Sequence, residues 1–224
     1  MSLRLQVAET PEDAARAAAD ALAGAAREGA NIALCGGSTP KRAFELAAEL
    51  EPDWSKATVW WGDERCVPAD DARSNYRLAR EALLDRLDRP PTVRRVETER
   101  GCEQAASHYE AALEGVTLDL ILLGIGPDGH TASLFPGSPA LSESERRVVA
   151  APPGLQPYVE RVTLTIPALS AGRKLVYLVT GAEKAEIAAR AFAGAPDPET
   201  PSSLVRSLAG ETVAILDRAA AARL

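Results

Sequence analysis

The chain has 224 residues, enough for one domain with a full hydrophobic core, and we assign residues 1–224 to a single domain. Hydrophobic residues make up 46% and charged residues 25%, as in soluble globular proteins, and no apolar run approaches the ~20 residues that span a bilayer. The formal net charge is −7, from 25 basic and 32 acidic residues, which argues against a general nucleic-acid-binding surface. An anionic ligand would therefore be held by a few well-placed cations.

The N-terminal segment and the cysteines indicate a cytoplasmic protein. Residues 1–7 lack the long apolar stretch of a secretion signal. The cysteines Cys35, Cys66 and Cys102 are odd in number and have no Cys-x-x-Cys spacing, which is typical of reduced thiols rather than of a disulfide or zinc framework. The carboxylates are scattered and histidines are scarce, so we expect no metal site.

The first predicted elements are a strand, a helix and a second strand. Residues 3–7 alternate in polarity, as in an edge strand. Thr10 is a typical helix N-cap, followed by proline and acidic residues in the first turn, and predicts a helix over residues 11–27. The apolar segment 31–35 predicts a short strand.

A turn rich in glycine and hydroxyl groups follows this second strand. Gly36 and Gly37 would let the backbone approach an anion, and Ser38 and Thr39 offer hydroxyl donors. The next helix would begin with Thr39 as its cap, end at Leu50, and direct free N–H groups and its positive dipole end at that anion. The turn lacks the Walker pattern, and it is equally compatible with an ordinary strand–helix connection that carries a Ser/Thr cap.

Charged residues follow the next predicted strand, residues 58–61. Asp63 and Arg65 are two positions apart, so in an extended backbone their side chains would point the same way. The alternative is that these charged residues lie on the solvated surface and have no functional role. Ser74 then predicts the cap of a helix that continues to about Leu87.

The chain is organised around residues 118–137. The first part, Leu118–Ile125, is an apolar run ended by glycines, as in a strand buried on both faces of a parallel sheet. A loop rich in glycine and proline then carries Asp128 and His130. Histidine suits proton transfer near neutral pH, and ligands of open α/β sheets bind at the carboxyl ends of strands. The alternative is that both side chains only stabilise a turn.

The same segment contains the G-x-G-x-x-G pattern of dinucleotide-binding proteins, at Gly124, Gly126 and Gly129. That fingerprint requires a helix at the third glycine and an acidic residue about 20 positions later, at the end of a second strand. Pro127 lies inside the motif, and the acids that follow lie in a polar, serine-rich stretch. We therefore expect no nicotinamide cofactor, and the sequence implies no other cofactor.

The last third of the chain adds four predicted strands, at residues 148–151, 159–166, 175–180 and 212–216, and a terminal helix at 217–223. Arg161 lies in the second of these strands, where it could simply face outward. Lys184 lies in the first turn of the helix after the third strand, where a cation is unfavourable unless an anion is near.

Strands and helices alternate along the chain. This predicts an α/β fold with a mainly parallel central sheet and helices on both faces. The turns at Gly36, Asp63, His130 and Lys184 all follow strands, so we expect them to share one edge of the sheet.

These motifs resemble the glucosamine-6-phosphate isomerase/6-phosphogluconolactonase family over nearly the whole chain. The resemblance rests on Gly36-Gly-Ser-Thr-Pro40, Trp61-Gly-Asp-Glu-Arg65, Ser74-Asn-Tyr76, the segment 124–137 and Arg161-Val-Thr-Leu-Thr165. The Gly-x-Asp-Gly-His core is shared with the deaminases of the family, which continue with a Phe-Asn-Glu-Pro type of segment. This chain instead has Ala132-Ser-Leu-Phe-Pro136, which favours the lactonase branch, although the segment 152–158 lacks the Lys-Pro-Pro pattern of the family.

The resemblance implies a Rossmann-like fold of the sugar-phosphate isomerase/lactonase type. It implies an enzyme that hydrolyses 6-phospho-D-glucono-1,5-lactone to 6-phospho-D-gluconate in the oxidative pentose-phosphate pathway. The implied partner is this small phosphorylated lactone, with no nucleic acid and no membrane, and the implied state is a monomer or small homo-oligomer.

The resemblance also implies roles for particular residues. His130 would be the general base, oriented by Asp128 or Asp63, and Arg65 would polarise the lactone carbonyl or stabilise the oxyanion. The groups implied to hold the phosphate are Ser38, Thr39, Arg161 and Lys184, with Gly36 and Gly37 allowing backbone amides to approach it.

Two other functions remain open at this point. A deaminase or isomerase of amino-sugar phosphates would use a similar pocket, but the Ser133-Leu-Phe-Pro segment argues against it. A non-catalytic sugar-phosphate sensor would not need Asp63, Arg65 and His130 together, and such domains usually accompany a DNA-binding segment, which this sequence does not show.

Overall fold

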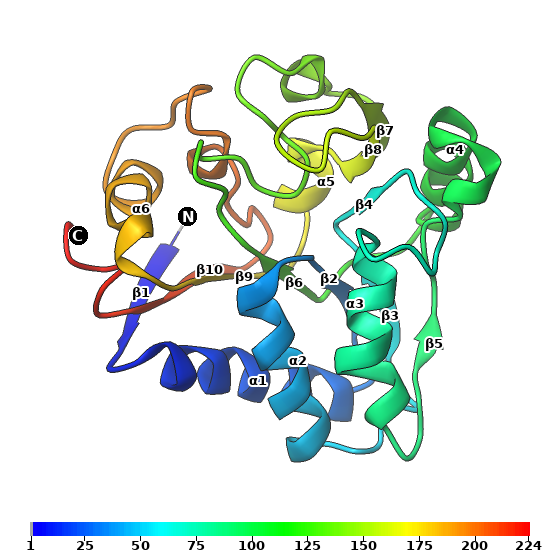
Figure 1. Cartoon of the computed structure of the whole chain (residues 1–224), viewed down its shortest axis with the longest axis horizontal. Coiled ribbons are helices and arrows are strands. Elements are labelled where there is room, and N and C mark those ends of the chain that lie inside the picture. The colour runs from blue at the N-terminus through cyan, green and yellow to red at the C-terminus, as the bar shows by residue number, and fades with distance from the viewer. Residues whose placement is uncertain (1) are drawn as a thin grey trace.

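A computed structural model describes residues 2–224, which form two β-sheets surrounded by helices (Figure 1). The strands are β1 (Ser2–Ala8), β2 (Asn31–Leu34), β3 (Thr58–Trp61), β4 (Asp63–Arg65), β5 (Thr92–Val93), β6 (Leu120–Leu123), β7 (Val148–Ala151), β8 (Arg161–Leu164), β9 (Lys174–Val179) and β10 (Glu211–Asp217). The α-helices are α1 (Pro11–Arg27), α2 (Ser38–Leu50), α3 (Asn75–Ala82), α4 (Cys102–Ala112), α5 (Ile166–Ser170) and α6 (Ala185–Phe192). Short 3₁₀ segments lie at Leu84–Arg86, Thr98–Arg100, Pro139–Ser142, Ala182–Lys184 and Pro201–Ser203.

The larger sheet confirms the predicted α/β architecture. Its seven strands run in the order β1-β10-β9-β6-β2-β3-β5, and each neighbouring pair is parallel. The α1 and α2 helices pack together on one side of this sheet, and α5 and α6 lie on the other (Figure 1). All four residues of the central strand β6 are buried, as its continuous apolar run predicted.

A second, antiparallel sheet was not predicted. It has the order β4-β8-β7, and β4 pairs with β8 so that Arg65 lies opposite Arg161. The backbone of Gly62 links the two sheets, because its N–H donates to the Leu34 carbonyl of β2 while its own carbonyl accepts from the N–H of Leu164 in β8. The residues that follow β3 therefore turn directly from the large sheet into the small one.

Capping signals were read correctly at two helices and wrongly at a third. Thr10 caps α1 by accepting a hydrogen bond from the Asp13 N–H, and Ser74 caps α3 in the same way from Arg77. The prediction that Thr39 caps the next helix is wrong. The α2 helix begins two residues earlier than this cap implies, at Ser38, and its cap is Gly37, whose positive φ of 115° is a conformation that favours glycine.

Two helix ends also differ from the prediction. The helix expected to reach Leu87 ends at Ala82, and a 3₁₀ turn follows it. The expected terminal helix is absent from residues 218–224, which form turns. Pairing with β1 extends β10 to Asp217, whose carboxylate accepts from the N–H groups of Gly181 and Ala220. The segment that follows β10 is therefore too short to form a stable helix.

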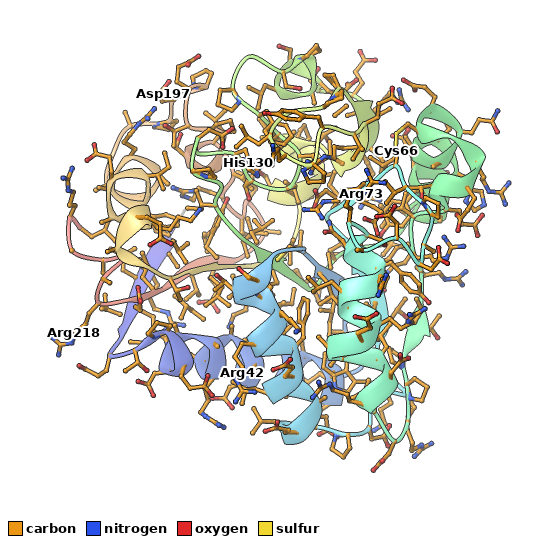
Figure 2. All side chains as sticks on the ribbon, viewed as in Figure 1. Arg42, Cys66, Arg73, His130, Asp197 and Arg218 are labelled. Carbon is orange, nitrogen blue, oxygen red and sulfur yellow. A yellow bond between two sulfur atoms is a disulfide. The ribbon has the colours of Figure 1, made fainter. Side chains whose placement is uncertain are left out.

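The expectation of three reduced thiols is wrong for two of them. Cys66 and Cys102 form a disulfide, with their Cα atoms 5.8 Å apart, and Cys35 is free and buried. The bond joins the chain just after β4 to the first residue of α4 (Cys66 is labelled in Figure 2). The partners are 36 positions apart in the sequence, so their spacing gave no sign of the pairing.

None of the helices formed by residues 2–224 is both long enough and apolar enough to cross a membrane.

Candidate active site

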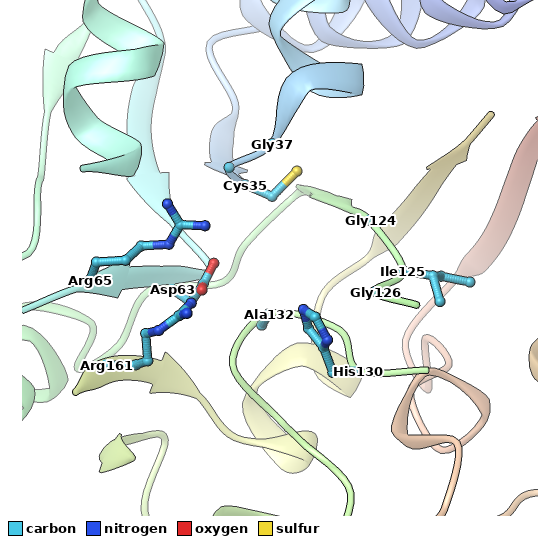
Figure 3. A pocket seen from close by; sticks show the side chains of 11 residues that line it. Cys35, Gly37, Asp63, Arg65, Gly124, Ile125, Gly126, His130, Ala132 and Arg161 are labelled. Atoms are coloured by element: carbon cyan, nitrogen blue, oxygen red, sulfur yellow. The ribbon is translucent and has the colours of Figure 1, made fainter. Parts of the chain in front are cut away.

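Two adjoining pockets lie where β2, β6 and β9 end and where the small sheet meets the large one. The first has a volume of about 190 Å³ and is lined by Asp63, Arg65, His130 and Arg161 (Figure 3). The second, of about 210 Å³, is lined by groups that include Ser38, Thr39 and Lys184, and both pockets share Gly36 and Gly37. Together they reach the size of small-molecule sites, ~300–1,000 Å³. The predicted convergence of the four turns at one edge is confirmed.

His130 is in contact with Asp128. The imidazole Nδ1 lies 2.5 Å from Asp128 Oδ1, and the His130 backbone N–H donates to the same oxygen at 3.1 Å. Burial alone would raise the pKa of Asp128, but the hydrogen bond and the charge of His130 outweigh it and lower that pKa. An ionised Asp128 favours a proton on Nδ1, and this leaves Nε2 as the nitrogen available to a substrate.

The loop around His130 is shaped by two special backbone positions. A methyl group at Gly126 would overlap Nδ1 and Cε1 of His130, so the imidazole can rest there only because residue 126 has no side chain. Ala132 has a positive φ of 50°, in a turn closed by the hydrogen bond from Leu134 N–H to the Thr131 carbonyl. A left-handed conformation costs a residue with a side chain ~1–2 kcal/mol, and Ala132 also lines the first pocket.

Asp63 binds other groups than His130. It is buried, and its carboxylate accepts from Ser133 Oγ at 2.6 Å and from Asn75 Nδ2 at 3.2 Å. Ser133 in turn donates its backbone N–H to Thr163 Oγ1 in β8. Of the two carboxylates considered as partners of His130, the one in contact is therefore Asp128. The roles of Ser133 and Asn75 were missed, although both lie within the motifs that carried the family resemblance.

Arg65 lines the first pocket and has one donor without a partner among the described residues. Its Nη1 donates to the Arg73 carbonyl at 2.6 Å, whereas its Nε is buried and has no hydrogen-bond partner among the described residues. A buried donor beside a pocket is a group that a bound oxygen atom could satisfy. Asp63 and Arg65 both line this pocket, as their spacing in an extended strand predicted.

Glu64, between these two residues, is a buried structural carboxylate that the sequence did not reveal. Only 2% of Glu64 is exposed, and its oxygens accept from the backbone N–H groups of Arg65, Asn75 and Tyr76, each at 2.7 Å. Burial raises the pKa of Glu64 in spite of these three donors. The contacts join the start of α3 to β4 and so fix the strand that carries Arg65.

Arg161 lies apart from the other residues predicted to hold a phosphate. It is 3% exposed, and it donates from Nε to Val159 and from Nη2 to the carbonyls of Leu155 and Pro157. Burial lowers the pKa of Arg161, against the opposing charge of Asp63. It lines the first pocket, across from His130 (Figure 3), and not the second. The alternative of an outward-facing strand residue is therefore wrong.

The second pocket combines several groups that favour an anion. The N-terminus of α2 contributes backbone N–H groups, Ser38 and Thr39 contribute hydroxyls, and Lys184 contributes an ammonium group. Lys184 Nζ donates to the Ile125 carbonyl at 2.8 Å. Burial lowers the pKa of Lys184, against the opposing charges of Glu183 and Asp128. Lys184 ends a 3₁₀ turn and is the N-cap of α6, so it lies one position before the helix whose first turn was predicted to contain it.

The loop of the G-x-G-x-x-G pattern and the His, Cys, Asp and Glu side chains can be located among residues 2–224. The loop after β6 continues in turns and opens no helix at Gly129. Among residues 2–224, no group of three His, Cys, Asp or Glu side chains is arranged to hold a metal ion.

Comparison with known proteins identifies the family. The family model for glucosamine-6-phosphate isomerases/6-phosphogluconolactonase matches residues 5–214. The 6-phosphogluconolactonase of Synechocystis sp. is 40% identical over 204 residues, which cover 86% of this chain and 84% of that protein. The Homo sapiens 6-phosphogluconolactonase is 39% identical over 220 residues, 92% of this chain and 85% of the relative.

Solved structures agree with this assignment. The 6-phosphogluconolactonase from Trypanosoma cruzi superposes with a TM-score of 0.87 at 30% identity, over 100% of this chain and 97% of the other. A monomeric glucosamine-6-phosphate deaminase has a TM-score of 0.86 at 21% identity, over 99% and 100%, and shares the fold. The chain belongs to the glucosamine-6-phosphate isomerase/6-phosphogluconolactonase family.

Proposed function

We propose that the chain is a lactonase that hydrolyses 6-phospho-D-glucono-1,5-lactone to 6-phospho-D-gluconate, the activity of the relatives named 6-phosphogluconolactonase. One observation carries the proposal: His130, which is paired with Asp128, lines one pocket together with Arg65, and the adjoining pocket gathers anion-binding groups. A cyclic ester with a distant phosphate requires a base and an oxyanion donor at one end of the site and a phosphate subsite at the other.

In the proposed reaction, His130 acts through Nε2. The neutral imidazole, held by Asp128 at Nδ1, takes a proton from a water molecule as the water oxygen attacks the lactone carbonyl carbon. Arg65 stabilises the negative charge that develops on the carbonyl oxygen, and its unpartnered Nε gains an acceptor. When the ester bond breaks, the ring oxygen leaves and takes the proton from His130, which gives a hydroxyl group and a carboxylic acid; the acid then releases its remaining water-derived proton to solvent and becomes a carboxylate.

The phosphate is assigned to the second pocket. Gly36 and Gly37 allow the backbone to approach it, Ser38 and Thr39 donate hydroxyl hydrogen bonds, and Lys184 supplies charge. A side chain at residue 36 would overlap Asn75 Oδ1, so this wall keeps its shape only with glycine.

Arg161 and Asp63 are assigned to the lactone end of the site. Arg161 lies there beside Arg65, and Asp63 holds the loop of His130 through Ser133. Arg161 is therefore assigned to the lactone end and not to the phosphate subsite.

All these groups come from one chain, so the proposal requires no oligomer. The phosphorylated substrate is a metabolite, and we propose the cytoplasm as the place of action.

The test follows the decay of freshly generated lactone with and without protein, and it reads the product through 6-phosphogluconate dehydrogenase because the lactone also opens spontaneously. His130→Ala should lower kcat by roughly 10²–10⁴ with a smaller change in KM, as expected for loss of a general base. His108→Ala is the matched control, because this second histidine lies half exposed on α4.

Two outcomes would contradict the proposal. If the wild-type chain does not accelerate decay above background, the lactonase assignment fails, and formation of fructose 6-phosphate and ammonia from glucosamine 6-phosphate would favour the deaminase instead. If His130→Ala retains the wild-type kcat, the reaction stands but the role of His130 does not.

A further inference from the structure

A buried aromatic ring packs against the imidazole of His130. The centroid of the Phe135 ring lies 4.4 Å from that of the imidazole, with 42° between the ring planes. Phe135 is only 6% exposed and donates no hydrogen bond. Its contact with His130 is therefore one of packing, and it covers part of an imidazole whose side chain is 21% exposed.

Phe135 is itself held by parts of the chain that are distant in sequence. A methyl group at Gly154 would come within 2.5 Å of three of its ring carbons, so the backbone at residue 154 lies directly against the ring. The guanidinium carbon of Arg161 lies 5.5 Å from the ring centroid, and Arg161 also binds the carbonyls of Leu155 and Pro157. The ring is thus wedged between the loop of His130, the segment that contains Gly154, and β8.

The hydrogen bond between Asp128 and His130 does not hold the imidazole against other segments of the chain. Asp128 is two positions from His130 in the same loop, so their hydrogen bond fixes the imidazole relative to its own loop. Phe135 instead connects the imidazole to a wall formed by other segments. A shift of ~1 Å in a reacting group can cost roughly 10²-fold in rate.

We propose that Phe135 is a positioning residue, which holds the imidazole of His130 so that Nε2 faces the first pocket. This inference rests on the proposed lactonase function. Phe135 lies outside the residues that line the pocket, so it acts through His130 and touches no reacting atom.

The first test replaces the ring by an aliphatic side chain. Phe135→Leu should lower kcat by about 10- to 100-fold, while KM changes by less than about threefold, because the phosphate subsite is untouched. The chain has 2 histidines, so the imidazole proton resonances of His130 and His108 can be followed separately by NMR. The resonances of His130 should shift when the ring current of Phe135 is lost, and those of His108 should not.

The second test keeps Phe135 and adds a methyl group at residue 154, whose backbone lies against the ring. Gly154→Ala adds a methyl group against the ring and alters no residue of either pocket. It should lower kcat, as Phe135→Leu does, and it should shift the His130 resonances because the retained ring is displaced relative to the imidazole. Gly24→Ala is the matched control, since nothing lies within 4 Å of a Cβ there. In the double variant the two effects should not add, because both act through one side chain.

The outcomes separate this inference from the proposed function. A wild-type kcat in Phe135→Leu would overturn the positioning role, whatever the resonances do, because loss of the ring current alone moves them. A lower kcat in Gly154→Ala with unmoved His130 resonances and a lower melting temperature would overturn it as well, because Phe135 would then only stabilise the fold. Absence of lactonase activity in the wild type would refute the proposed function, and the His130 resonances of Gly154→Ala, which retains the ring, would still decide whether Phe135 fixes the imidazole.

Discussion

Removal of the Cys66–Cys102 disulfide should lower the free energy of unfolding by about 4 kcal/mol. The two cysteines are 36 positions apart, and the chain-entropy relation for a cross-link that closes a loop of this length gives about 4 kcal/mol at 25 °C. In a domain of this size, each kcal/mol lowers the melting temperature by ~2–4 °C, so the fall should be roughly 8–16 °C. The kcat at 25 °C should stay close to that of the wild type. Backbone bonds hold β4 independently, among them the one from Cys66 N–H to the Glu160 carbonyl.

The assay is guanidinium chloride unfolding of the wild type and of the Cys66→Ala/Cys102→Ala variant, followed by the fluorescence of the buried tryptophans. Wild type treated with a phosphine reductant should match the variant. Cys35→Ala, which leaves the disulfide intact, controls for the loss of a cysteine side chain.

Two results would refute this reasoning. Mass spectrometry of the alkylated, unreduced chain could find three free thiols, in which case the disulfide does not form in the protein. If the bond is present but the reduced and oxidised forms unfold at the same denaturant concentration, the loop-entropy argument is wrong for this chain.

Further predictions concern the two carboxylates, the phosphate subsite and the free thiol. Asp128→Asn should lower kcat by roughly 10²–10⁴, because the amide no longer favours a proton on Nδ1 of His130. Asp63→Asn should lower the melting temperature more than Asp128→Asn does and should lower kcat less. If Asp63→Asn instead causes the larger loss of kcat, Asp63 would be the group that orients His130. Lys184→Met should raise KM for the phosphorylated lactone by about 10- to 100-fold and spare hydrolysis of unphosphorylated glucono-1,5-lactone; equal losses on both would place Lys184 outside the phosphate subsite. Burial raises the pKa of Cys35, so little of the reactive thiolate forms at ordinary pH. Iodoacetamide at about pH 8.5 should therefore label Cys35 only after denaturation. Labelling of the native chain at the rate of a free thiol would contradict the burial of Cys35.

The large sheet could be predicted because its elements carry local signals. The apolar run that forms β6 reflects burial on both faces, and the residues that follow β2, β6 and β9 reach the same edge because parallel strands align their carboxyl ends. The proximity of His130 to the glycine turn at residue 36 follows from this rule alone.

The small sheet could not be predicted in the same way. The β4 strand is three polar or charged residues long, Asp63–Arg65, and shows no hydrophobic periodicity. It becomes a strand because β8 pairs with it and because the carboxylate of Glu64 accepts from two backbone N–H groups at the start of α3, those of Asn75 and Tyr76, as well as from Arg65. A charge run that is normally solvated is here buried, and only the tertiary contacts explain why.

The sequence also could not predict which residues line which of the two pockets, because this depends on distances across the edge of the sheet. Sequence patterns marked Ser38, Lys184 and Arg161 as anion-binding side chains but could not show that Arg161 lies with His130 and the other two lie together. The packing of Phe135 on His130 was hidden for the same reason, since an apolar residue in a loop gives no sign of which side chain it will cover.

The order of strands in the large sheet has a consequence for the synthesis of the chain. The first strand, β1, pairs with β10, from Ser2 opposite Glu211 to Ala8 opposite Asp217, and β10 separates it from β9. The ribosome therefore releases β1 long before β10, the strand that joins it to the sheet. Until residues 211–217 have emerged, β9 remains an exposed edge and β1 has no place in the sheet, so the growing chain must protect both segments until β10 arrives.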